Sequence, residues 1–345
     1  MSFNRLEADD FVVSADSITA GLFTNNQVPE ITTFFTSSTQ RLSTSGDYYL
    51  NIFSNETTSS LEFAVTYGNK EGSGSIAYDT AVDGKSPSST VYGQYRTLVL
   101  GDENADFTFG SITSSDFWVI SAERSRYKES IFPGSTTLLI SGSDGVISLT
   151  DNSQVASSVV FNDAGRVFQL VSGSAGNVFN TLESNGYSIN SGSYGLFLPD
   201  IATYILNPRA LSNDEADGGI GLVTQVTSSI DPLLVTPNKN STIIFEAISS
   251  SDAASFTANS EETITSDFVF VRPRSSQFNY SENPSFISGS TGEVLYPSFI
   301  NAPTTYITTV GLYNDTNELL AVAKLSKPLE KDFTKEALVR VKLDF

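Results

Sequence analysis

Histidine and cysteine are both absent from this chain of 345 residues, and tryptophan and methionine occur once each. Without histidine there is no Ser-His-Asp triad, no imidazole base that titrates near neutral pH and no imidazole metal ligand. Without cysteine there is no thiol nucleophile, no thiolate zinc site and no disulfide. The fold therefore has to be held by packing alone, as is usual for proteins made in a reducing cytoplasm.

Basic residues are also scarce, with 19 Lys and Arg against 39 Asp and Glu, a net charge of −20. Nucleic-acid binding and docking on anionic lipid both need a basic face, so we expect neither. Residues 315–345 hold six basic and six acidic residues, so residues 1–314 carry the whole excess. Such a charge keeps an abundant protein soluble and keeps its copies apart until assembly. The first ten residues lack a basic region and an apolar run, which predicts no signal peptide, and no stretch reaches membrane-spanning length.

The apolar residues that are present favour strands. Phe (24) and Tyr (14) dominate, and Ser, Thr, Asn and Gly separate short apolar runs. Alternation over 61–67 predicts a strand that ends at an exposed loop, 68–74, and 92–100 and 117–120 are also predicted as strands. From Ser135 on, runs at 137–141, 146–150, 155–161 and 166–171 have the spacing of a small antiparallel sandwich or barrel. One helix is predicted at 200–212, with Asp200 as its N-cap and Pro208 interrupting it. The predicted fold class is mainly β, with antiparallel sandwich- or barrel-like domains.

Changes in composition predict three parts. They are an N-terminal β-rich part (1–134), a middle β-sandwich-like domain (135–235) and a C-terminal β-rich part (236–345). If the flanks form one domain, the middle domain is inserted into it and projects outward. Polar joints at 213–219 and 231–240 suggest the second boundary. The sequence leaves open whether the flanks are separate domains or one interrupted domain. It also leaves open whether residues 1–35 form an ordered strand or an arm that orders on assembly.

The last forty residues predict a hairpin and a final strand. Alternating runs at 306–313 and 319–325 are joined by the polar loop 314–317, which is typical of a hairpin. Residues 337–345 then place Val339 and Val341 on one face and Arg340 and Lys342 on the other. We expect this strand to lie in a sheet, the chain's own or a neighbour's, and predict it as an assembly contact.

The remaining catalytic chemistry is that of carboxylates and oxygen-ligated cations. Adjacent acidic pairs on a strand point to opposite faces, so these pairs are expected to be solvated turns: Asp9/Asp10, Asp102/Glu103 and Glu261/Glu262. The run Asn213–Gly218 resembles a calcium loop, but its twelfth position is Thr224 in place of a glutamate. The glycine runs 72–74 and 192–195 lack the ending of a phosphate loop. We therefore predict no catalytic, cofactor-binding or metal-binding residues, no cofactor and no enzyme activity.

Two arginine pairs, Arg124/Arg126 and Arg272/Arg274, are the local basic spots before residue 315. In so acidic a chain they are expected to form ion pairs, within the subunit or across an interface.

Several segments carry a family resemblance: 67–74, 91–96, 123–129, and above all Tyr306–Asp315 with Leu319–Pro328. They resemble virion structural proteins of large contractile-tailed bacteriophages, cyanophage-like myoviruses included. The hairpin is also similar to hairpins of phage tail-fibre and baseplate components. The resemblance covers about 60–130 and 270–345. It implies a structural subunit of the virion tail, in the baseplate or neck region, synthesised in the host cytoplasm, which binds other virion proteins and forms a homo-oligomer within the assembly. It supplies no catalytic residues.

Two alternatives stay open. The chain could be a receptor protein that binds host-surface glycans, or cleaves them with carboxylates, in which case Tyr187, Tyr194 and Phe197 would stack on sugar rings. The same composition suits a capsid decoration protein.

Overall fold

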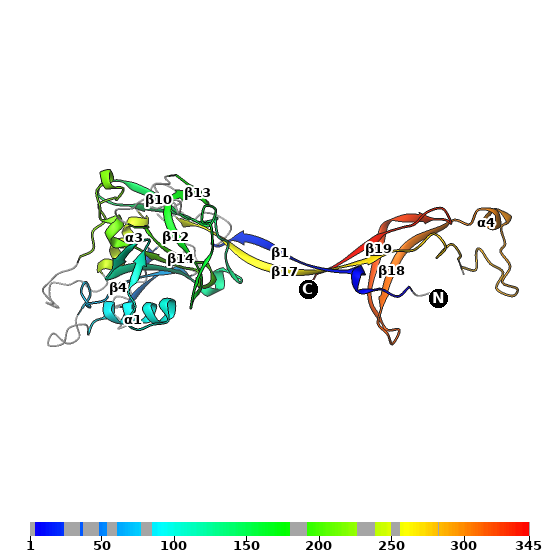
Figure 1. The fold of residues 1–345 in the computed structure, drawn as a ribbon, viewed down its shortest axis with the longest axis horizontal. Helices are drawn as coiled ribbons and strands as arrows, with labels where there is room; N and C mark the ends of the chain where they lie inside the picture. Colours follow the sequence, from blue (N-terminus) through cyan, green and yellow to red (C-terminus); the bar gives the residue numbers. More distant parts are fainter. Residues whose placement is uncertain are drawn as a thin grey trace. The chain divides into compact units, whose positions relative to one another are not determined.

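The computed structural model describes residues 4–23, 35–36, 48–53, 61–76, 85–179, 192–225, 239–249, 256–281 and 283–344. The chain divides into two compact units: unit 1 is Met1–Ser17 with Thr263–Phe345, and unit 2 is Ile18–Glu262. Unit 2 is therefore inserted into unit 1. Both are built mainly from antiparallel strands (Figure 1), which confirms the predicted fold class. Among the described residues no helix has the length and apolar character needed to cross a membrane.

Unit 2 is organised around one large antiparallel sheet. Its longest path of described strands runs β16-β9-β10-β12-β14-β15-β7-β4-β3-β2, with β11 and β13 also paired to β12. The bounds are β2 (Phe35–Thr36), β3 (Tyr49–Phe53), β4 (Leu61–Asn69), β7 (Asp116–Ala122), β9 (Thr137–Ser141), β10 (Val146–Asp151), β11 (Val160–Asn162), β12 (Gly165–Ser174), β13 (Asn177–Val178), β14 (Gly195–Leu198), β15 (Thr203–Leu206) and β16 (Phe256–Thr257). The strands β5 (Phe107–Phe109) and β6 (Ile112–Ser114) pair separately.

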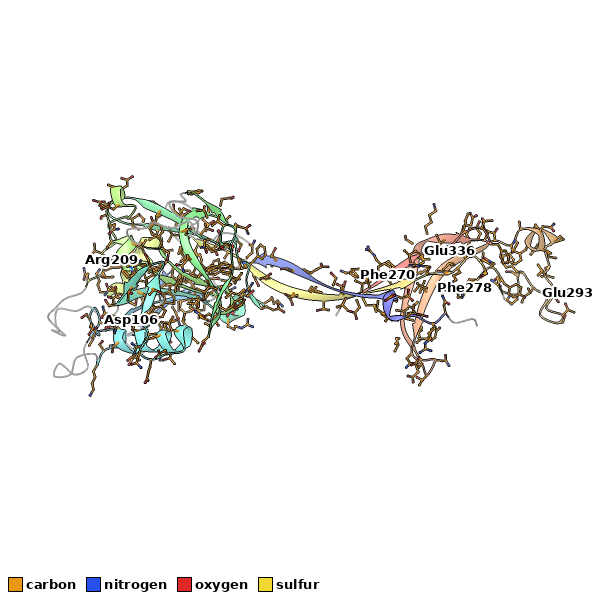
Figure 2. All side chains as sticks on the ribbon, viewed as in Figure 1. Asp106, Arg209, Phe270, Phe278, Glu293 and Glu336 are labelled. Carbon is orange, nitrogen blue, oxygen red and sulfur yellow. The ribbon has the colours of Figure 1, made fainter. Side chains whose placement is uncertain are left out.

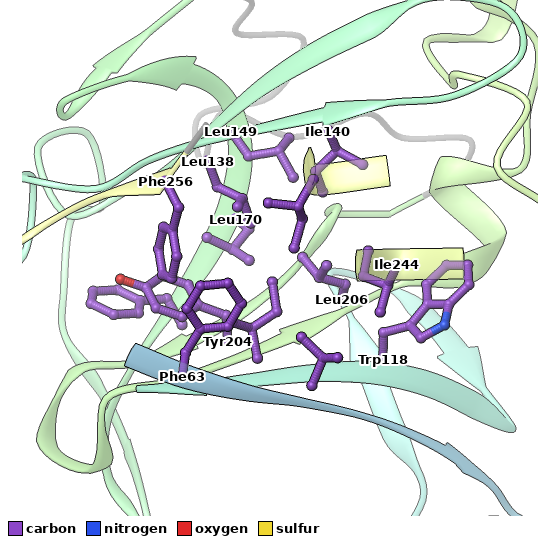
Figure 3. Packing of buried hydrophobic residues seen from close by; sticks show 14 of the residues in the cluster. Phe63, Trp118, Leu138, Ile140, Leu149, Leu170, Tyr204, Leu206, Ile244 and Phe256 are labelled. Carbon is purple, nitrogen blue, oxygen red and sulfur yellow. The ribbon is translucent and has the colours of Figure 1, made fainter. Parts of the chain in front are cut away.

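The central strands are buried on both faces, because successive side chains enter different cores. In β7, Trp118 and Ile120 join one apolar cluster, whereas Phe117 and Val119 join another. The first cluster is shown in Figure 3, where the Phe256 ring lies among other aromatic rings. Its centroid is 5.0 Å from that of Phe23, 5.6 Å from that of Phe63 and 5.2 Å from that of Tyr204.

Helices cover the two faces of this sheet. On one face, α1 (Pro87–Leu100) packs against β4 and buries Val91, Tyr92 and Val99 in the second cluster. The predicted strand at 92–100 is therefore wrong. Its apolar residues recur every three to four positions, which is the helical period. On the other face, α3 (Lys239–Ser249) packs on β4 and β9, and the Trp118 indole donates a hydrogen bond to the Asn240 carbonyl (2.9 Å).

Two further local predictions are corrected. The predicted helix at 200–212 is replaced by the fully buried strand β15, and a short helix, α2 (Pro208–Leu211), begins at the proline that was expected to interrupt it. Proline fits the first turn of a helix, where its missing N–H has no partner to lose. The loop 68–74 is not exposed throughout, because Ser86 Oγ donates to the Gly72 carbonyl (2.6 Å) and Ser88 Oγ to that of Ser73 (2.9 Å). These bonds fasten the loop to the start of α1.

The predicted boundaries after 134 and 235 are also corrected. Strand β7 lies before the first boundary and pairs with β15, which lies after it. Strand β16 lies beyond the second boundary and pairs with β9. Residues 135–235 therefore share one sheet with residues from both flanks. Turn-forming residues mark where strands end, but they do not determine which strands pair.

Unit 1 consists of two thin layers. One is the sheet β1-β17-β20, with β1 (Phe11–Gly21), β17 (Asn259–Val271) and β20 (Val339–Asp344). Strands β1 and β17 cross the boundary between the units, and β8 (Ser130–Ile131) pairs with the part of β17 in unit 2. The other layer is the hairpin of β18 (Thr305–Tyr313) and β19 (Leu319–Lys331), orange to red in Figure 1. A one-turn helix, α4 (Pro297–Asn301), precedes the hairpin.

The predicted C-terminal hairpin and final strand are both present. The hairpin is present, with Val310 opposite Ala323, and both pack with Val269, Val339 and Val341 of the other layer. The final strand is β20, which pairs with β17 of the same chain. Its valines are buried and Arg340 and Lys342 are exposed, as the alternation predicts. Of the N-terminal segment, residues 11–21 form β1, and residues 24–34 lie outside the described residues.

Candidate functional site: the surface and groove of unit 1

The candidate calcium loop serves a structural role. Asp214 is the N-cap of a 3-10 helix (Glu215–Asp217), and its carboxylate accepts a hydrogen bond from the Asp217 N–H (3.0 Å). Asp214, Glu215 and Asp217 all face solvent. In the part of the chain that the structure describes, no three acidic side chains are grouped so that they could hold a metal ion.

The acidic pairs do not come together as catalytic carboxylates. Asp102 lies in an exposed turn and accepts a hydrogen bond from the Asn104 N–H (2.8 Å), as expected of a turn. Glu261 differs, because it is half-buried in β17, accepts a bond from Ser130 Oγ (3.2 Å) and lies 3.8 Å from the Arg166 guanidinium. That arginine is held by Asp200 at 2.7 Å. This network ties β17 to the large sheet of unit 2.

Among the described acidic residues of unit 2, Asp116 is the one whose carboxyl pKa is clearly shifted. Tyr67 donates to it through its hydroxyl (2.9 Å), Asn69 donates to that hydroxyl (3.3 Å), and Ser114 Oγ lies 3.3 Å from Asp116 Oδ1. Burial raises the pKa of Asp116 and also that of Tyr67. The carboxyl begins β7 and is bound by neighbours in β4 and β6, so the arrangement fastens these three strands together.

The two arginine pairs have different surroundings. Arg126 forms an ion pair with the buried Glu62 carboxylate (3.1 Å), which confirms an ion pair within the subunit. The Arg124 guanidinium lies 4.6 Å from the centre of the Tyr127 ring and donates to the Tyr127 carbonyl (2.8 Å). By contrast, Arg272 and Arg274 of unit 1 are exposed and form no ion pair within the described residues.

Two of the aromatic residues proposed to bind sugar belong to the core. Tyr194 is buried and its hydroxyl donates to the Gly218 carbonyl (2.6 Å). Phe197 is fully buried and stacks on Tyr204 at 4.7 Å. Neither ring offers a face to a ligand, so both are core residues and lend no support to the sugar-binding alternative. Tyr187 lies outside the described residues.

Exposed apolar side chains concentrate in unit 1. Unit 2 contains 43 of the 47 buried apolar residues among the described residues, whereas unit 1 contains four. Yet 16 of the 26 large apolar residues that are exposed belong to unit 1. They are Phe11, Val12, Val13, Phe278, Tyr280, Phe286, Leu295, Tyr296, Ile300, Tyr306, Tyr313, Leu319, Leu320, Val322, Phe333 and Leu338. Side chains crowd the interior of unit 2, whereas in unit 1 many stand out from the backbone; Phe278 lies in the irregular segment after β17 (Figure 2).

A groove of about 1390 Å³ is hollowed into unit 1. One wall is β18, and the other walls are residues 4–11, 271–281 and 294–303 together with Phe333. Aromatic rings of Phe11, Phe278, Phe299 and Phe333 line it. Its charged lining residues are Arg5 and Asp315, so the lining is close to neutral and mostly apolar. Sequence analysis found the hairpin but missed the groove, because the other walls come from irregular segments with no recognisable pattern.

One buried ammonium fixes a wall of this groove. Lys331, the last residue of β19, is fully buried although it is charged. Its Nζ donates to the Ser275 carbonyl (3.0 Å), to Asn279 Oδ1 (2.8 Å) and to the Asp332 carbonyl (2.8 Å). All three ammonium donors therefore have acceptors. Asn279 also donates to the Ser275 carbonyl (2.6 Å), so residues 275–279 are held in place below the groove.

Comparison with known proteins yields no match, whether to protein families, to characterised proteins or to solved structures.

Proposed function

We propose that this protein is a structural subunit of a phage virion, attached through unit 1 to the neighbouring subunits of a contractile tail. The observation that carries the proposal is the concentration of exposed apolar side chains on unit 1, which has almost no core of its own. A soluble domain rarely leaves so much apolar surface uncovered unless another protein binds it. The resemblance of the β18–β19 hairpin to hairpins of tail components supports a place in the tail.

The charge distribution supports the same division of roles. Unit 2 has 26 acidic and 10 basic residues, a net charge of −16, whereas unit 1 has 13 and 9, a net charge of −4. Interfaces are depleted of charge at their centres and rich in aromatic residues. Unit 1 has the aromatic part of that composition, with exposed rings such as Phe278, Tyr306 and Phe333, and the larger net charge of unit 2 suits a surface that stays in solvent.

The test is incorporation into particles. Leu320 and Val322 are exposed on β19, so Leu320→Ser with Val322→Ser removes apolar surface without touching the core of unit 1. The matched control, Val159→Ser with Val160→Ser, removes exposed apolar surface from unit 2. We expect particles made with the first variant to lack the subunit, and particles with the control to contain it. Equal incorporation of both variants would refute attachment through unit 1.

Electron microscopy of particles carrying a labelled subunit tests the location. Label at the baseplate or neck is the expected result. Label over the capsid would make the protein a decoration protein, and no label would exclude it from the virion.

A further inference from the structure

The strand β18 has an open and unprotected edge. It pairs with β19 on one side, and no strand of the described residues pairs with its other side. Its nine residues include no charge and no proline, whereas each of the other strands described in unit 1 contains a charged residue. The outer edge of β19, for comparison, has Pro328 and two lysines, Lys324 and Lys327. Proteins block sheet edges with charge and proline to prevent pairing, so an edge without either is available for it.

The groove of unit 1 runs along this edge. Five consecutive residues of β18, Thr309 to Tyr313, line it. Successive side chains of a strand point to opposite faces, so a cavity that touches all five lies beside the strand and not over one face. The site therefore offers backbone donors and acceptors on one side and aromatic pockets on the other. This is the geometry that receives an added extended strand.

The occupant has to be uncharged, because the lining is apolar and contains one positive and one negative side chain. Strand β18 itself has this chemistry: it is neutral and rich in Thr, Tyr, Ile, Val and Leu, the residues that strands favour. Two copies aligned antiparallel would also set no like charges against each other. The low net charge of unit 1, −4 against −16 for unit 2, makes it the part of the chain where two copies meet with least repulsion.

We propose that two copies of this chain pair edge to edge through β18. The pair forms the continuous sheet β19-β18-β18-β19 about a two-fold axis, and each β18 lies in the groove of the other copy. In a two-fold contact the same surface of each copy meets the other, and the uncharged edge of β18 can meet itself without repulsion. A second copy of the chain would be one of the partners of unit 1, and this role rests on the proposed function. The pairing itself is tested on the purified protein alone.

The experiment introduces a charge that is compatible with the fold of one copy but opposes the pairing of two copies. Thr309 is exposed, is the middle residue of β18, and lies opposite Lys324 in the hairpin. Thr309→Glu therefore adds a favourable cross-strand pair inside each copy. In a centred antiparallel pair of β18 strands, however, it places two carboxylates side by side. The matched control is Ser326→Glu, which adds the same charge at an exposed position of β19.

The mass of each full-length protein is measured by sedimentation over a range of concentrations. We expect the wild type and Ser326→Glu to form dimers, and Thr309→Glu to dissociate at concentrations at least about tenfold higher. Hydrogen exchange in β19 and β20 checks that the variant hairpin is folded. A monomeric wild type, or a Thr309→Glu protein that dimerises as tightly as the wild type, would overturn the inference. Neither result bears on incorporation into particles, so pairing through β18 and attachment through unit 1 can be refuted separately.

Discussion

Replacing Lys331 with methionine should loosen unit 1 while leaving unit 2 unchanged. The substitution keeps the length of the side chain and removes an ammonium that donates to three acceptors at 2.8–3.0 Å. The Ser275 carbonyl keeps its bond from Asn279 (2.6 Å) and the Asp332 carbonyl keeps one from the Lys335 N–H (3.3 Å), so the loss falls mainly on the buried Asn279 Oδ1. Each acceptor left without a partner in a buried site costs about 1–3 kcal/mol. The variant no longer has to bury a charge, which offsets part of that cost. We expect a net loss of about 2 kcal/mol in the local stability of unit 1, most of it from Asn279 Oδ1.

Hydrogen exchange measures this loss, because it reports local opening. A loss of about 2 kcal/mol corresponds to roughly 30-fold faster exchange, expected at the amides of residues 275–279 and of β20. Trp118 is the single tryptophan and is buried in unit 2, so its fluorescence follows the unfolding of unit 2 alone. The midpoint of this unfolding transition should be the same in the variant and the wild type. The control is Lys327→Met, an exposed position on the same strand, which should change neither readout. Unchanged protection of residues 275–279 in Lys331→Met would refute the reasoning.

Three further predictions concern unit 2 and are all followed by tryptophan fluorescence. Burial raises the pKa of Asp116 above its ordinary value of 3.8, so the folded state binds this proton more tightly than the unfolded state. The protonated carboxyl therefore stabilises the fold fully below pH 3.8, and this stabilisation is lost as pH rises through the pKa of the folded state. Asp116→Asn should remove this fall, and an unchanged pH profile would contradict the assignment. Phe256→Ala should cost about 3–5 kcal/mol because it empties the aromatic cluster, whereas exposed Phe161→Ala should cost under about 0.5 kcal/mol; equal effects would contradict the packing described. Arg126→Met should cost about 3 kcal/mol, because it leaves the Glu62 carboxylate buried without its cation, and Arg126→Met with Glu62→Gln should recover part of the loss.

Local patterns in the sequence predict strands well where alternation is clear. The hairpin, the final strand and the run at 137–141 are found where the residues place them, since each has one buried and one exposed face or a clear turn at its ends. The helix α1 was predicted as a strand because its aromatic and β-branched residues favour strands by type. Their spacing and the sequence Ser86-Pro87 are the helix signals that could have identified it.

The groove and the division into units could not be predicted in the same way. Both depend on contacts between residues more than 250 positions apart, such as the hydrogen bonds of Asn4 to the Arg272 carbonyl (3.5 Å) and of Gln277 to Asn4 Oδ1 (3.2 Å). Composition does not encode such contacts. The absence of histidine and cysteine limits the chemistry of the chain, but the exposed apolar surface of unit 1 is recognised only when burial separates exposed aromatic residues from core ones.

The insertion of unit 2 into unit 1 has a consequence for how the gene can be altered. The two crossings between the units fall at Ser17/Ile18 and at Glu262/Thr263, within the hydrogen-bonded neighbours β1 and β17. Leu22 and Ala258, just inside the inserted unit, are joined by a backbone hydrogen bond of 3.0 Å. The inserted unit therefore enters and leaves at one point, and the two cut ends of its host lie on paired strands. Such an arrangement makes unit 2 an interchangeable domain: another domain with adjacent termini could be inserted in its place without altering the strand pairing of unit 1.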